Sequence, residues 1–189
     1  MDAIDLYLTE LEDVIHHLSR DEVRAVADAL LDAWRARRQV FIIGNGGSAA
    51  TASHMMNDLN KFTRVDGQPR FRAIALTDNV PWMTAVGNDQ SYHDIFVEPL
   101  MNLLEPGDTV IAISASGNSP NIVKAVEYAR AHGARVIGFC GRPGGQLAQM
   151  ADLKVIIPSD RIGHQEDGHM ILDHALSFAL LERIRREAA

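Results

Sequence analysis

Apolar residues change their spacing near residue 39, and this change separates two kinds of segment. Before it, most apolar residues follow helical spacing, at Leu6, Leu8, Leu11, Val14, Ile15 and Leu18. Ser19 and Glu22 then form a capping box, which predicts a second helix that ends near Arg37. We therefore expect two helices within residues 1–38.

After residue 39, short runs rich in β-branched and aromatic residues alternate with helical stretches. The runs lie at 39–43, 71–76, 109–114, 135–140 and 154–157. They are apolar nearly throughout, which is typical of parallel strands covered by helices on both faces. The pattern predicts an α/β fold, a doubly wound five-stranded parallel sheet flanked by helices, with an N-terminal helical extension. Segment 64–70 reads as a surface loop, and a last long helix is expected from about Glu166 to Arg186.

The composition indicates one domain and narrows its setting. With 189 residues, 47% of them hydrophobic, the chain can bury one core but is short for two, so residues 1–189 are treated as one domain with residues 39–189 as its α/β core. A net charge of -7 argues against nucleic acid or an anionic membrane as partner. The single Cys140 suits a reducing compartment, as a buried structural thiol. Since no run approaches the roughly 20 apolar residues of a membrane span and the acidic N-terminus is no signal peptide, we expect a cytoplasmic protein.

Two of the predicted strands lead into loops of Gly, Ser and Asn that precede helical stretches. The first loop is Gly-Asn-Gly-Gly-Ser at 44–48, and the second is Ser-Ala-Ser-Gly-Asn-Ser at 114–119. Close backbone amides, serine hydroxyls and helix N-termini all favour a bound anion, and both loops follow strands at the edge of the sheet where ligands gather. The loops predict a phosphate site, although turns and helix caps use the same residue types. The spacing does not fit dinucleotide-binding or P-loop motifs.

The segment from Ile113 to Asn121 resembles the phosphosugar-binding signature of the sugar isomerase (SIS) domain family. Other segments resemble its phosphoheptose isomerase branch, namely 44–61 with His54, 86–89 followed by 94–96, and 166–169 with His174. The resemblance covers nearly the whole chain. It implies an SIS fold, a homotetramer with active sites at subunit interfaces, and isomerisation of sedoheptulose 7-phosphate to D-glycero-D-manno-heptose 7-phosphate through a cis-enediol. Isomerisation of another phosphosugar remains an alternative.

The resemblance also implies which residues contact the substrate. Ser114, Ser116 and Ser119 form the phosphate clasp, with Ala115 where the family usually has Thr. Asn45, Gly46, Gly47 and Ser48 add donors for the sugar. Asn88 and Asp89 match a substrate-contacting pair of the family, although Gly-Asn-Asp is also a good turn sequence.

Four further residues carry the implied chemistry. By spacing alone, His54 and Asp58 share one helix face, which fits a solvated surface, a zinc site or a proton-transfer pair. The resemblance places His54 on a metal-binding histidine, Asp58 on a catalytic and metal-binding glutamate, and His174 on a histidine that is both metal ligand and acid/base. Glu166 stands where a glutamine ligand is usual. One zinc ion per subunit is thus implied, held by these four residues, with Asp58, Glu166 and His174 as catalytic groups.

The departures from the family pattern leave three questions open. The carboxylate of Asp58 is one methylene shorter than that of Glu, so either Asp58 or Glu166 could be the base. On one straight helix, Glu166 and His174 would be separated by about 12 Å along the axis. They can therefore bind the same ion only if Glu166 precedes the regular helix or if different subunits contribute. The third question is whether the chain is instead a non-catalytic SIS protein that resembles a replication-initiator-associating protein.

Overall fold

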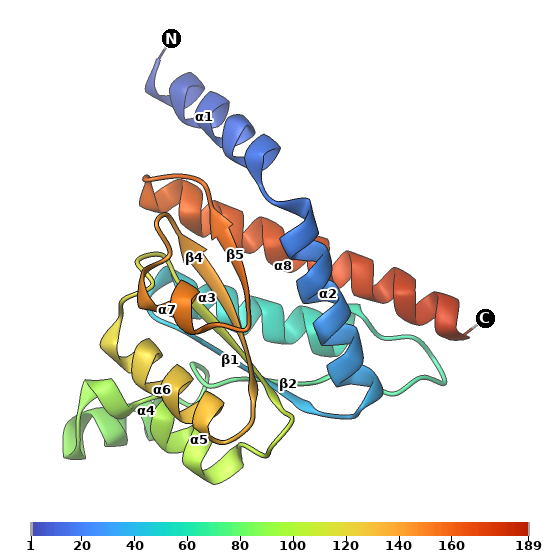
Figure 1. Ribbon diagram of the computed structural model, residues 1–189, viewed down its shortest axis with the longest axis vertical. Helices are drawn as coiled ribbons and strands as arrows, with labels where there is room; N and C mark the ends of the chain where they lie inside the picture. The colour runs from blue at the N-terminus through green and yellow to red at the C-terminus, as the bar shows by residue number, and fades with distance from the viewer. Residues whose placement is uncertain (1, 189) are drawn as a thin grey trace.

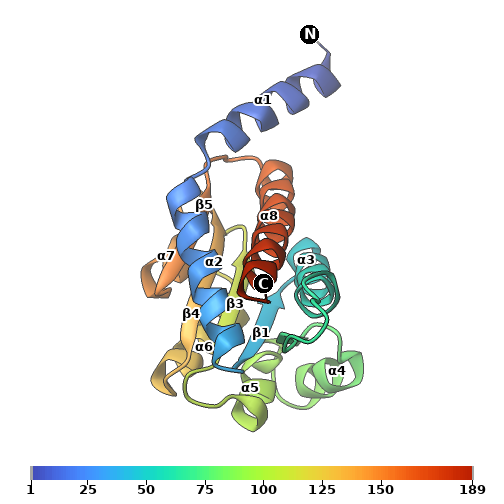
Figure 2. The same cartoon turned by 90° about the vertical axis from the view of Figure 1, so that its right-hand side faces the viewer.

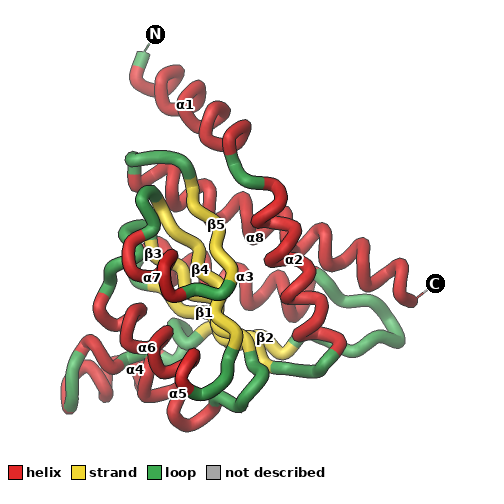
Figure 3. The backbone as a smooth tube through the Cα atoms, viewed as in Figure 1, coloured by secondary structure: helices red, strands yellow, loops and turns green. Residues whose placement is uncertain are grey.

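The computed structural model describes residues 2–188, which form a five-stranded sheet in the order β2-β1-β3-β4-β5 (Figures 1 and 3). The strands are β1 (Gln39–Gly44), β2 (Arg72–Ala75), β3 (Thr109–Ser114), β4 (Arg135–Gly141) and β5 (Leu153–Ile157). All four pairings are parallel. The predicted fold class is confirmed, and each observed strand overlaps a predicted one.

Helices cover both faces of the sheet because successive strand residues point to opposite sides. Val40 and Ile42 pack with α2 (Arg20–Arg35), α3 (Gly47–Asn57) and α8 (Ile162–Ala188). Phe41 and Ile43 pack on the other face, which is covered by α4 (Val80–Asp89), α5 (Val97–Leu103), α6 (Pro120–Ala131) and α7 (Gly145–Met150). A buried apolar layer therefore lies on each face of the sheet, and Figure 2 shows α2, α3 and α8 next to the sheet.

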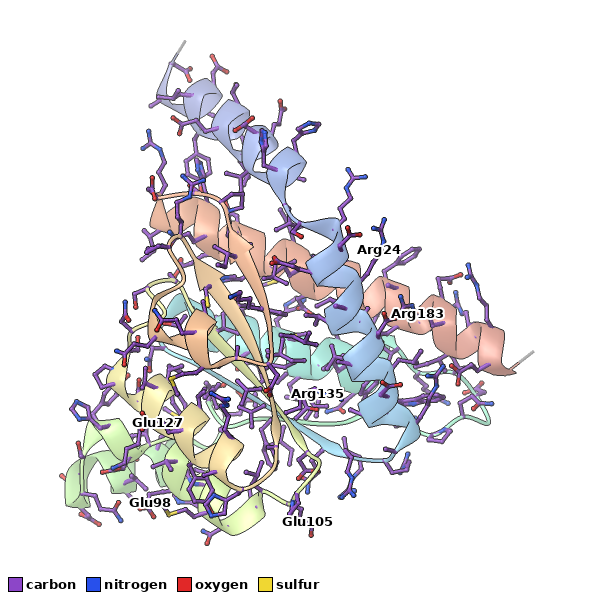
Figure 4. All side chains as sticks on the ribbon, in the orientation of Figure 1. Arg24, Glu98, Glu105, Glu127, Arg135 and Arg183 are labelled. Carbon is purple, nitrogen blue, oxygen red and sulfur yellow. The ribbon has the colours of Figure 1, made fainter. Side chains whose placement is uncertain are left out.

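The two predicted N-terminal helices are present, and they lie differently. Helix α1 (Ala3–His17) projects from the body of the molecule in both ribbon views (Figures 1 and 2). Helix α2 begins after Ser19, whose hydroxyl accepts a hydrogen bond from the Glu22 amide at 3.4 Å, as the capping box predicts. Arg183 of α8, labelled in Figure 4, donates to Asp28 of α2 at 2.6 Å and joins these two helices.

The last helix begins earlier than the sequence predicts. Helix α8 starts at Ile162. Just before it, the Ser159 hydroxyl accepts a hydrogen bond from the Arg161 amide at 3.1 Å. Gly168 lies inside this helix and packs closely on β5. A Cβ there would come within 2.8 Å of Ile157, so only glycine allows this packing. Glu166 is therefore a residue of the regular helix. The possibility that Glu166 precedes the helix is wrong.

The helix after the first loop changes its hydrogen-bonding pattern near its end. It is α-helical to Asn57 and continues as a π-helical turn over Asp58–Phe62. Such wide turns are rare and occur often at functional sites. No helix within residues 2–188 has the length and apolar character that crossing a bilayer requires. Cys140 is buried as predicted, and burial raises the pKa of its thiol to about 12.

Candidate active site

The two Gly/Ser loops lie next to each other because β1 and β3 are neighbouring parallel strands. Together with the start of α8 they enclose a cavity of about 190 Å³ at the carboxyl edge of the sheet. It is lined by Asn45, Ser48, Ile113, Ser114, Ala115, Ser116, Ser119, Ile162 and Glu166. The structure thus brings both predicted anion-binding loops into one cavity.

The second loop leads into α6 without the usual serine cap. Ser119 occupies the N-cap position of this helix, yet its side chain makes no capping hydrogen bond. Its hydroxyl oxygen lies 3.5 Å from that of Ser114, which accepts a hydrogen bond from the Gly117 amide at 3.1 Å. Because an ordinary capping serine would satisfy an amide of the first turn, this arrangement favours an anion site over a structural cap.

The first loop turns sharply into α3 and is tied to the second. Gly46 has φ +55° at the N-cap position, where no side chain caps the helix. Asn45 and Asn121 exchange two amide hydrogen bonds of 2.9 Å, and the Tyr92 hydroxyl donates to Asn45 at 3.0 Å. Asn121 has no assigned role in the sequence prediction. It fixes the distance between the two loops.

Glu166 reaches the cavity from the first turns of α8. It is half-buried, and its carboxylate lies over Gly47, where a Cβ would come within 2.4 Å of Oε1. Asn88 and Asp89 are exposed at the end of α4 and do not line this cavity. Their contact with substrate stays a prediction.

A second group of side chains lies farther along α3 and α8. The Nε2 atom of His54 is 3.2 Å from Nε2 of His174 and 3.6 Å from Oδ2 of Asp58. The fourth member is Asp173, whose Oδ2 is 4.0 Å from the same nitrogen. We call these four residues the His/Asp cluster, and one ligand atom from each lies within 4.8 Å of all the others. Ligand atoms around a tetrahedral zinc ion with bonds of about 2.0 Å are roughly 3.3 Å apart, so the cluster has the scale of a single cation site.

Asp173 was missed by the sequence prediction and is the buried member of the cluster. Its Oδ1 accepts a hydrogen bond from Ser177 at 3.3 Å, whereas Oδ2 has no hydrogen-bond partner among the residues the structure describes. Burial raises the pKa of Asp173 to about 6, and nearby Asp58 adds to the effect, while the two histidines oppose it. An acidic residue on the apolar face of a predicted helix, next to His174, was the available signal.

Glu166 does not belong to the His/Asp cluster. It precedes His174 by eight residues on one continuous helix, a rise of about 12 Å. Within one chain, the structure therefore brings together three of the four predicted metal ligands, and Asp173 occupies the fourth place. Glu166 lies with the phosphate clasp instead.

A family model described as SIS domain matches residues 6–141. The chain belongs to the SIS domain family. A curated phosphoheptose isomerase of Mycobacterium bovis is 40% identical over 157 residues, which cover 83% of this chain and 80% of the relative. One of Geotalea daltonii is 36% identical over 176 residues, which cover 92% and 90% of the two chains.

Solved structures of the family agree. A phosphoheptose isomerase from Neisseria gonorrhoeae matches with a TM-score of 0.87 and 27% identity, covering 94% of this chain and 96% of that one. One from Francisella tularensis matches with a TM-score of 0.86 and 29% identity, covering 96% and 100%. The predicted SIS fold, the phosphoheptose isomerase branch and the isomerase class are confirmed, and the non-catalytic alternative loses support.

Proposed function

We propose that the protein interconverts sedoheptulose 7-phosphate and D-glycero-D-manno-heptose 7-phosphate. The observation that carries the proposal is the placement of the cavity and the His/Asp cluster along the same two helices. Both Gly/Ser loops converge on an anion site, and titratable side chains lie two turns farther along α3 and α8. The relatives named phosphoheptose isomerases support this substrate.

The distance between the two groups suits a substrate whose reacting carbons are far from its phosphate. His54 follows Gly47 by seven residues on α3, a rise of roughly 10 Å. In an open-chain heptose 7-phosphate, the phosphate and the C1–C2 pair are at opposite ends of the carbon chain. We place the phosphate between Ser114 and Ser119 and the C1–C2 end toward the cluster.

The chemistry is proton transfer between C1 and C2 through a cis-enediol. A carboxylate removes the proton next to the carbonyl, and His174 carries a proton between the two oxygens. Asp58 lies in the cluster and is placed for the first role, while Glu166 lines the cavity and is the other candidate base. A zinc ion held by the cluster would stabilise the oxyanion that develops.

The experiment is NMR of purified protein with sedoheptulose 7-phosphate in deuterated water. Appearance of the aldose with deuterium at C2 is expected, whereas no aldose and no label would overturn the proposal. Asp58→Asn and Glu166→Gln, measured in parallel and compared at equal Zn²⁺ content, identify the base, because its loss abolishes label at C2 in a protein that still holds its metal. Ser119→Ala is the matched control for phosphate binding and should raise KM more than it lowers kcat.

We also infer a cytoplasmic homotetramer whose active sites are completed at subunit interfaces. Both histidines of the cluster are exposed, and Phe178, one turn beyond His174, is 61% exposed. Apolar side chains of α1 are exposed as well, so the chain offers surfaces that a second copy would cover. Size-exclusion chromatography with light scattering tests the oligomeric state, and a monomer would contradict the inference.

A further inference from the structure

We propose that this chain completes its divalent-cation site within one protomer, with Asp173 as the fourth ligand in place of residue 166. The inference rests on the cation of the proposed function and concerns which side chains hold it. A site made this way would not need a carboxamide or carboxylate from a second subunit. Glu166 would then be free to act on the sugar.

The burial of Asp173 is the first support. Its side chain is 0% exposed, and its Oδ2 faces His54 with no hydrogen-bond partner within the described chain. A buried carboxylate oxygen left unpaired is costly, and such groups are normally paired or coordinate a metal. A cation among the four side chains would satisfy this oxygen.

The two carboxylates of the cluster share one arrangement, which is the second support. Asp58 accepts a hydrogen bond from Asn57 on Oδ1 at 3.1 Å and turns Oδ2 toward His54 at 3.6 Å. Asp173 accepts one from Ser177 on Oδ1 and likewise turns Oδ2 toward His54. Hydrogen bonds that fix one carboxylate oxygen while the other binds are typical of the outer shell of metal sites.

The chemistry of the donor set is the third support. Two imidazole nitrogens and two carboxylate oxygens suit zinc and related divalent ions, and the two negative charges balance the charge of the cation. Asp58 is shorter than the glutamate of the family pattern. Asp173, the residue before His174 on α8, adds a second carboxylate whose ligand oxygen lies within 4.8 Å of the ligand atoms of the other three residues.

The test is metal binding, measured apart from catalysis. Metal is removed with a chelator, and Co²⁺ and Zn²⁺ are titrated into wild type, Asp173→Asn, Glu166→Gln and His54→Ala. Wild type is expected to bind one ion per chain with the intense visible absorption of four-coordinate Co²⁺. Asp173→Asn should bind Zn²⁺ more than about tenfold more weakly, while Glu166→Gln keeps the wild-type affinity. His54→Ala is the positive control and should lose stoichiometric metal.

Two results would overturn the inference: no ion bound by wild type, or wild-type affinity kept in Asp173→Asn. Thermal unfolding with and without Zn²⁺ shows that each variant is folded, since Asp173→Asn keeps the shape of the side chain and an acceptor for Ser177. The isomerase assay is run separately. An active enzyme whose metal affinity ignores Asp173 refutes only this inference, and an inactive protein with an Asp173-dependent site refutes only the proposed function.

Discussion

Gly47 lies where the first loop becomes α3, and the Glu166 carboxylate occupies the space that a side chain would take. We expect Gly47→Ala to push this carboxylate out of position while the backbone stays in place, because the clashing atoms are the end of a flexible side chain. The kcat/KM should fall more than about tenfold, since displacements near 1 Å can cost a hundredfold. Steady-state kinetics and thermal unfolding of the same variant measure this. If the variant is unfolded to the same extent that its activity is reduced, the prediction is wrong.

His169 predicts how stability depends on pH. It is 1% exposed, and burial lowers its pKa to about 4, from an ordinary value near 6.5. Between these values the unfolded chain binds a proton that the native chain does not, so stability rises with pH across this window and is lost as pH falls. From pH 6.5 to 4.5 this term removes roughly 2 kcal/mol of unfolding free energy. Urea unfolding at both pH values should show a smaller loss for His169→Gln than for wild type, and equal losses would refute the assignment.

Single residues also show where the sequence prediction reached its limit. The clasp serines, His54, Asp58 and His174 could be found because each stands on a recognisable motif. Asp173 gave only the weaker signal of an acidic residue on an apolar helix face, because its importance comes from burial and from the approach of α3 to α8, which spacing along the chain does not describe. The same packing places Glu166 with the clasp instead of the cluster.

At the scale of elements, the strands were predictable and the ends of two helices were not. Nearly continuous apolar runs indicate parallel strands buried on both faces, and the sheet follows them. The sequence predicts that the last helix begins near Glu166, but it begins at Ile162 and includes Gly163 and Gly168, where a Cβ would come within 2.6 Å of Tyr7 and 2.8 Å of Ile157. The π-helical turn at Asp58 has no local sequence signal, since it also uses ordinary helix-compatible residues.

The second loop yields a prediction about how one element supports another. Gly117 has φ +64°, and a Cβ there would lie 2.0 Å from the carbonyl oxygen of Gly144, in the turn before α7. Gly117→Ala must therefore displace backbone and should destabilise the fold by several kcal/mol. Gly46→Ala is the matched control, because Gly46 also has positive φ but has open space around it. Chemical unfolding of both should show a clearly larger loss for Gly117→Ala, and similar losses would mean that backbone strain, not the clash, dominates.

At the scale of the whole molecule, α1 is a helix that extends from the body (Figure 2). The hydrogen bond from Tyr7 to Asp167 and the ion pair between Arg161 and Glu10, each 2.6 Å long, join it to the start of α8. One face carries a stripe at Ile4, Leu8, Leu11 and Ile15, spaced as on one side of a helix. Ile4 is 70% exposed and Leu8 53% exposed, and a second copy of the chain, as proposed above, would bury this stripe.

Leu8→Glu is therefore expected to break the assembly. It should keep cation binding and lose isomerase activity. Burying a leucine contributes about 1.5–3 kcal/mol at each contact, and a charge in its place opposes association at every equivalent interface. Light scattering should show a smaller species for Leu8→Glu, while Glu12→Lys, an exposed polar site on the same helix, keeps the wild-type mass. Because the His/Asp cluster lies wholly within one chain, the dissociated variant should still bind Zn²⁺ although its isomerase activity falls. If zinc is lost together with the assembly, the fourth ligand comes from a neighbouring subunit and not from Asp173.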